Sequence, residues 1–162
     1  MNRSWKILGL LTIALAASPA QAADDSLKPL LAWGNKYPFD KVDGKDFWAF
    51  EPLAQRLRAM MGMQTHQFFM DNLAHGVVTP VYVKDGILWT DMCEPHNCVA
   101  VHAYLFVDTN KDKAYACLRN DDKEQYFWFV DGAAVMPVGE DDCMVREGEK
   151  APLDLFNRMR KG

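Results

Sequence analysis

The hydrophobic period of the sequence changes at Gly76, and this change constrains the fold more than any other feature. Before it, apolar residues recur every three to four positions, as in helices. After it, β-forming residues dominate five segments separated by short polar turns, which connect antiparallel neighbours. The sequence therefore predicts an α+β fold, with N-terminal helices packed on one face of an antiparallel meander of about five strands. The strand segments are VTPVYV (78–83), ILWTDM (87–92), VAVHAYLFVD (99–108), KAYACLRN (113–120) and EQYFWFV (124–130).

Two helices are expected ahead of the sheet. The pattern LAQRLRAMMG predicts the first over residues 52–61, with Gly62 as its stop. The second is expected over residues 65–74, with Thr65 as its N-cap. A short closing helix is expected at residues 152–160.

The first 22 residues have the pattern of a secretory signal peptide. Two basic residues precede an apolar run over residues 7–17, and the small-residue triplet Ala-Gln-Ala follows at 20–22. The apolar run is shorter than the roughly 20 residues that a spanning helix needs. We expect cleavage after Ala22, which leaves residues 23–162 as a single exported domain with no membrane-spanning segment.

The charge of the exported part excludes some partners. Residues 1–22 contain Arg3 and Lys6 and no acidic residue, so their removal takes the formal net charge from −4 to −6. An acidic surface disfavours nucleic acid and anionic membranes and speeds association with a basic protein. Plain solubility explains the same charge equally well.

Four cysteines, Cys93, Cys98, Cys117 and Cys143, lie in the exported part, where thiols are oxidised. They allow three pairings. Cys93 and Cys98 enclose four residues at a strand connection, where Pro95 favours a tight turn, so we expect them to pair with each other. Cys117 and Cys143 are then left to pin the C-terminal segment to the sheet.

The loop Cys93-Glu94-Pro95-His96-Asn97-Cys98 presents a histidine inside the smaller ring. As a metal site it lacks a second pair of ligands, and as a redox site it lacks C-x-x-C spacing. We therefore expect no metal and no cofactor. Two interpretations of His96 remain, an inconsequential polar residue and an exposed recognition residue that enters a cleft on a partner.

The segment ILWTDMCEPHNCVAVHAYLFVD, residues 87–108, resembles the inhibitor of vertebrate lysozyme (Ivy) family of Gram-negative periplasmic proteins, whose signature is a C-x-P-H-x-C loop after a strand. The resemblance extends from about Gln64 to Val138. It implies a periplasmic inhibitor of c-type lysozyme that is not itself an enzyme. It also implies that His96, framed by the disulfide, hydrogen-bonds the catalytic carboxyl groups of the lysozyme.

The loop departs from the common family pattern C-K-P-H-D-C at two positions. Glu94 stands in place of a basic residue and Asn97 in place of an aspartate. Glu94 could be repelled by the carboxylates of the target or could meet a basic group on the rim of its cleft. Asn97 can form hydrogen bonds but not an ion pair. Potency and target preference therefore stay open.

Other functions remain as alternatives. The protein could regulate the lytic transglycosylases of its own cell, which also use an acidic residue in a glycan cleft, or it could be a periplasmic metal-binding protein or a small enzyme. A serine hydrolase is excluded because every serine lies within the first 26 residues. His66, His75 and His102 are interpreted as ordinary residues. The aromatic run 126–129 predicts core packing, with homodimerisation as the alternative if one face is exposed.

Overall fold

The computed structural model describes residues 25–146, 148–149 and 152–161. The expected signal peptide, residues 1–22, lies outside them. Within the described part of the chain, each helix is too short or too polar to cross a membrane.

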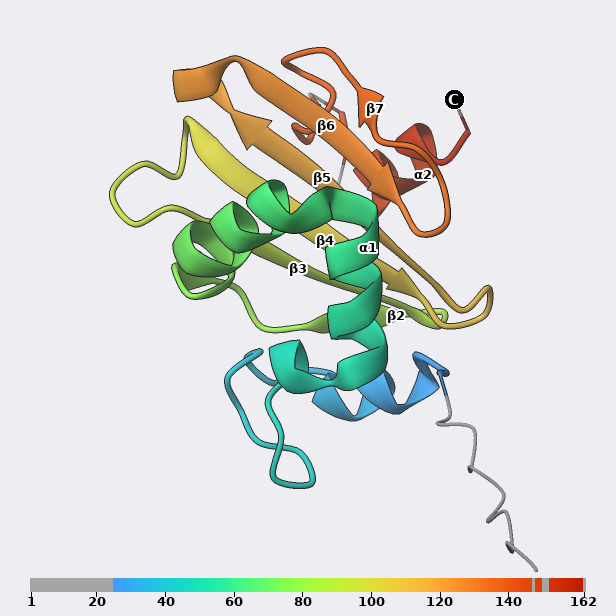
Figure 1. The fold of residues 1–162 in the computed structure, drawn as a ribbon. Coiled ribbons are helices and arrows are strands. Elements are labelled where there is room, and N and C mark those ends of the chain that lie inside the picture. The colour runs from blue at the N-terminus through green and yellow to red at the C-terminus, as the bar shows by residue number, and fades with distance from the viewer. Residues whose placement is uncertain (1–24, 147, 150–151, 162) are drawn as a thin grey trace, which may run out of the picture.

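The N-terminal half is helical, as predicted, and it breaks at Gly62. The α-helix α1 spans Glu51–Phe68, and the π-helical turn η3, Phe69–Ala74, continues it. Gly62 has φ 71° and ψ 167°, a conformation open to glycine and costly for other residues, and the green ribbon of α1 bends sharply in Figure 1. The two predicted helices are therefore two arms around this residue. The short 3₁₀ helices η1, Lys28–Trp33, and η2, Phe47–Ala49, precede them.

The sheet is an antiparallel meander, as predicted, but it has seven strands. Its order is β1-β3-β4-β5-β6-β7, and β2 also pairs with β3. The strands are β1 Val77–Val78, β2 Tyr82–Lys84, β3 Ile87–Cys93, β4 Val101–Asp108, β5 Lys113–Asn120, β6 Gln125–Val130 and β7 Met136–Pro137.

The prediction of one strand over residues 78–83 was wrong, because this segment divides into β1 and β2. Between them, Val81 leaves the sheet and exchanges backbone hydrogen bonds with Asn35 and Lys36. Pro80 has no N–H to donate to a ladder. At Val81, the N-terminal segment thus takes the place of β3 as the backbone hydrogen-bonding partner.

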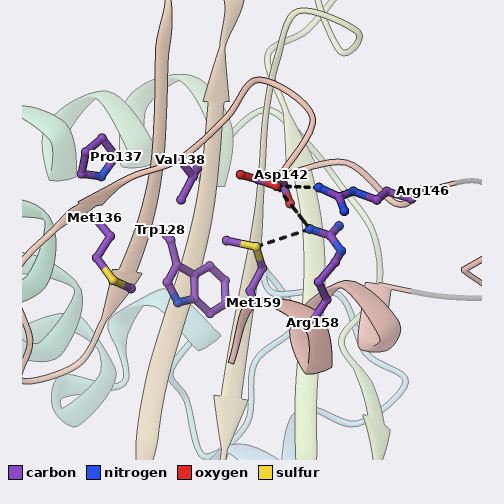
Figure 2. A pocket seen from close by; sticks show the side chains of 8 residues that line it. All are labelled: Trp128, Met136, Pro137, Val138, Asp142, Arg146, Arg158 and Met159. Atoms are coloured by element: carbon purple, nitrogen blue, oxygen red, sulfur yellow. Dashed lines mark hydrogen bonds and ion pairs between the residues drawn. The ribbon is translucent and has the colours of Figure 1, made fainter. Parts of the chain in front are cut away.

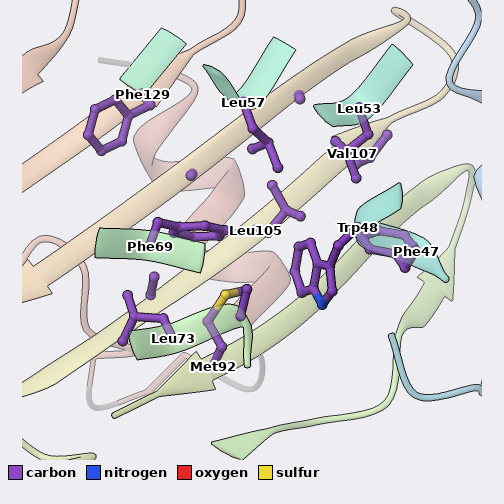
Figure 3. Packing of buried hydrophobic residues seen from close by; sticks show 14 of the residues in the cluster. Phe47, Trp48, Leu53, Leu57, Phe69, Leu73, Met92, Leu105, Val107 and Phe129 are labelled. Carbon is purple, nitrogen blue, oxygen red and sulfur yellow. The ribbon is translucent and has the colours of Figure 1, made fainter. Parts of the chain in front are cut away.

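Both faces of the sheet are covered. On one face, Leu53 and Leu57 of α1 belong to the same buried cluster as Leu105 and Val107 of β4 (Figure 3). On the other, Phe156 of the C-terminal helix α2, Pro152–Met159, packs 4.9 Å from the ring of Phe106. The predicted packing of the N-terminal helices on one face is confirmed, and α2 covers the opposite face.

The aromatic run 126–129 contributes to both layers. Phe127 and Phe129 pack with the α1 cluster and Trp128 with the α2 cluster, because side chains alternate along a strand. All four side chains of the run are buried or half-buried. The run therefore packs in the core, as predicted.

Candidate functional site

The loop between β3 and β4 projects beyond one end of the sheet. In Figure 1 it is the yellow-green excursion beside the turn that joins β5 to β6. Disulfide bonds join Cys93 to Cys98 and Cys117 to Cys143, the pairing that the sequence favours. His96 is exposed on this projection.

A tight turn presents His96. The amide of Asn97 donates to the carbonyl of Glu94 over 3.0 Å, which places Pro95 and His96 at the two central positions. His96 has φ 67°, so a proline is followed by a left-handed residue, as in a type II turn. A non-glycine residue in this region costs about 1–2 kcal/mol. Strain of this kind at an exposed loop tip is typical of functional positions.

The base of the loop is closed by backbone hydrogen bonds. The amide of Glu94 donates to the carbonyl of Val101 over 3.1 Å, and the amide of Val101 donates to the carbonyl of Asn97 over 2.9 Å. Together with the disulfide, these bonds hold the tip in one conformation before any partner arrives. A braced loop of this kind binds without the entropic cost of ordering.

Asn97 explains the departure from the common loop pattern. Its side-chain amide donates to the carboxylate of Glu94 and to that of Asp122, each over 2.9 Å. Asp122 belongs to η4, Asp121–Lys123, in the turn between β5 and β6. The two N–H groups of one neutral amide thus join two carboxylates and tie the loop to the neighbouring turn. An aspartate at position 97 would instead place a third carboxylate beside those of Glu94 and Asp122.

Asn97→Asp is therefore expected to lower the free energy of unfolding by about 1–2 kcal/mol at pH 7, since it replaces two charge-assisted hydrogen bonds by repulsion. Urea unfolding of the variant and the wild type measures the difference. Adding Glu94→Lys to the variant, which recreates the pair of the common pattern, is expected to recover part of the loss. An Asn97→Asp variant as stable as the wild type would show that the amide does not brace the loop.

Gly76 lies under the base of the loop. A Cβ atom added there would be 2.4 Å from the carbonyl oxygen of Cys93, 2.7 Å from that of Asn72 and 3.1 Å from Pro95. Only glycine permits the chain after η3 to approach the loop so closely. The sequence identifies Gly76 as the point where the period changes, but it carries no signal of this contact.

A hollow of about 290 Å³ adjoins the disulfide on the sheet face that carries α2. Asp91 and Tyr104 are register partners across β3 and β4, as are Cys93 and His102, so these four side chains share that face. The other lining residues are Cys98, Val99 and Met144. Sequence reasoning missed this group because Asp91 carries no motif and His102 looks like an ordinary strand residue.

Burial sets the electrostatics of the hollow. It raises the pKa of the Asp91 carboxyl, an effect that the nearby His102 opposes only in part. Burial, together with the Asp91 charge, raises the pKa of Tyr104 to about 12. The Nε2 atom of His102 lies 3.1 Å from the carbonyl oxygen of Cys143, and because a carbonyl only accepts, this nitrogen carries the proton. The hollow thus contains one carboxyl group, that of Asp91, beside the phenol ring of Tyr104 and the imidazole ring of His102, whose Nε2 donates a hydrogen bond.

The two remaining histidines, His66 and His75, do not line the hollow. Burial, with the charge of Arg58, lowers the pKa of His66 on α1, and His75 stacks on the ring of Phe39. Among the described residues, no group of three or more histidines, cysteines or acids is placed to hold a metal ion.

A second hollow, of about 310 Å³, lies beside α2 (Figure 2). Its arginines are already neutralised: Arg146 pairs with Asp142 over 2.6 Å, and Arg158 pairs with Glu149 over 2.9 Å. The ring of Trp128 and the sulfur atoms of Met136 and Met159 supply apolar lining. Among the described residues that line this hollow, each arginine has an acidic partner and none is a nucleophile, so the hollow does not compete with the loop as a functional site.

The comparison with known proteins covers the loop and the part of the hollow that β3 and β4 form. Residues 52–137, more than half of the chain, match the family described as inhibitor of vertebrate lysozyme (Ivy). The match begins at the start of α1, earlier than the resemblance in the sequence, and it ends at β7. No curated protein and no solved structure is significantly similar to the chain. The family match, which includes the whole of the projecting loop, shows that the chain belongs to the Ivy family.

Proposed function

We propose that the protein is a periplasmic inhibitor of c-type lysozyme that inserts His96 into the active-site cleft of the enzyme. Membership of the Ivy family supports a lysozyme-inhibitor role. The observation that carries the finer proposal is the exposed, strained His96 at the tip of a loop braced by a disulfide. The protein itself performs no catalysis in this mechanism.

The imidazole suits the chemistry of the target. Lysozyme cleaves glycans with a carboxylic acid of raised pKa and an ionised second carboxylate. An imidazole ring offers a nitrogen on either side, and when protonated both nitrogens donate hydrogen bonds. His96 between the two carboxyl groups would occupy the position of the scissile bond and block the substrate.

The acid at position 94 is compatible with this placement. Glu94 is half-buried and accepts a hydrogen bond from the Asn97 side chain. The carboxylate therefore has a partner within the loop, which reduces its repulsion of the carboxylates in the target. The proposed role of the loop does not require a lysine at this position.

The proposal predicts that association with a c-type lysozyme is fast at low salt and slows as ionic strength rises. The acidic inhibitor attracts a basic enzyme over distances that salt screens, since the Debye length falls from about 30 Å at 0.01 M to about 8 Å at 0.15 M. Dissociation is expected to change less, because short-range contacts hold the complex. Stopped-flow measurements over a series of salt concentrations give both rates.

A lytic transglycosylase from the same kind of cell provides the comparison enzyme. Inhibition of lysozyme with the salt dependence above supports the proposal. A salt-independent association rate for lysozyme, together with tighter binding to the transglycosylase, would contradict it and assign the loop to the control of endogenous wall enzymes.

A further inference from the structure

The hollow beside the disulfide lies within reach of any partner that binds His96. Cys98 forms part of its wall and is two residues from His96, a Cα separation of at most about 7 Å. A standard interface buries about 800 Å² on each partner, which corresponds to a patch about 16 Å in radius. Such a patch centred on His96 extends past Cys98 and Val99, two residues of the wall of the hollow.

Asp91 gives the hollow an unpaired negative charge. Its carboxylate is half-buried, yet among the described residues no side chain or amide donates a hydrogen bond to it. Withdrawing a carboxylate from water without a partner is unfavourable. Tyr104 stays a neutral phenol at pH 7, because its pKa of about 12 is far above that pH. The site is therefore built to attract a positive charge.

The other walls suit a long basic side chain. Val99 and Met144 present apolar atoms to the opening, and the stems of arginine and lysine pack well on such surfaces. The aromatic ring of Tyr104 also lines the hollow, and aromatic rings attract cations. A small metal ion fits less well, since the described residues gather no set of ligands here.

On the basis of the proposed function, we propose that this hollow receives an arginine or lysine side chain from the rim of the lysozyme cleft, with Asp91 as its ion-pair partner. The inhibitor then has two contacts on its target. His96 engages the catalytic carboxyl groups, and Asp91 selects lysozymes with a basic residue at the matching position on the rim.

Asp91→Asn tests the second contact without changing volume. We expect it to weaken binding to a c-type lysozyme at least about tenfold, mainly through faster dissociation. Thermal stability should not fall. The folded state raises the pKa of Asp91, so its ionised form costs stability at neutral pH, a cost that disappears as the pH falls through that pKa. The asparagine removes this cost at neutral pH.

Asp85→Asn is the matched control. Asp85 is exposed in the turn between β2 and β3, at the opposite end of β3, and its positive φ is one that asparagine tolerates. The Asp85→Asn variant changes the net charge by the same amount as Asp91→Asn. It therefore measures the loss of binding that comes from weaker long-range electrostatic attraction alone. Equal binding by the Asp91→Asn and Asp85→Asn variants would overturn the inference.

A second pair of variants tests the same contact by substitutions at the surface, without changing a residue inside the sheet. Val99 and Met63 are both 83% exposed, so a lysine at either position leaves the core intact. Val99→Lys places a competing cation at the hollow and is expected to weaken binding more than Met63→Lys, on α1. Equal effects of the two lysines would contradict the inference.

Lysozyme variants identify the partner residue. In a panel in which each arginine or lysine of the cleft rim is replaced by alanine, one variant should weaken binding to the wild-type inhibitor but not to Asp91→Asn. If no variant shows this coupling while His96→Ala weakens inhibition as expected, the hollow is not a contact and the proposed function survives. If the wild-type protein does not bind lysozyme at all, the proposed function itself fails.

Discussion

His96→Ala is expected to weaken inhibition of c-type lysozyme at least about 30-fold, the loss that corresponds to a hot-spot residue of about 2 kcal/mol. The reason is that the imidazole carries the polar contacts to the catalytic carboxyl groups, whereas the neighbouring side chains of the loop brace it. Inhibition titrations against a fixed concentration of lysozyme measure the change. His96 is exposed, so the fold should be preserved.

His96→Gly separates the ring from the shape of the loop. Glycine adopts the observed φ of 67° without the steric cost that a side chain incurs, so this variant should be more stable than His96→Ala by up to about 1 kcal/mol. It should nonetheless inhibit as poorly as His96→Ala. Thermal unfolding gives the first comparison and the titration the second. Inhibition at the wild-type level by either variant would show that the ring is not the inhibitory group.

We expect the Cys117–Cys143 disulfide to contribute mainly to stability and the Cys93–Cys98 disulfide mainly to lysozyme binding. Replacing Cys117 and Cys143 with alanine should lower the free energy of unfolding by about 3–4 kcal/mol, because the bond closes a loop of 26 residues and both sulfurs are fully buried. Replacing Cys93 and Cys98 with serine removes a link only five residues apart, for which the same model gives about 2 kcal/mol. The backbone and Asn97 bonds of the loop should limit this loss further.

For lysozyme binding, we expect loss of the Cys93–Cys98 disulfide to have the larger effect and loss of the Cys117–Cys143 disulfide the smaller one. Freeing the Cys93–Cys98 loop should weaken lysozyme binding by about 1–3 kcal/mol, since each side chain ordered on association costs about 0.5–1.5 kcal/mol. Urea unfolding and binding titrations on both double variants, at a salt concentration held constant, separate the two effects. Equal losses of stability and of binding for the Cys93–Cys98 variant would mean that the bond is merely structural.

The sequence by itself determined the features that depend on neighbours along the chain. The change of period at Gly76, the break at Gly62 and the order of helices before strands all follow from local backbone preferences. The tight ring of Cys93 and Cys98 was also predictable, because the separation is only five residues and Pro95 favours a turn that brings the two thiols together. The loop and its histidine could therefore be identified before the fold was known.

The tertiary structure decided the features that join distant segments. The backbone of Val81 pairs with Lys36 and divides a predicted strand, and Asn97 reaches Asp122 across the end of the sheet. The hollow around Asp91 exists only because strand register and the C-terminal segment bring its walls together. Such contacts have no period or motif in the sequence, since their energy depends on which surfaces meet when the chain packs, and many pairings of similar residues are compatible with the same local pattern.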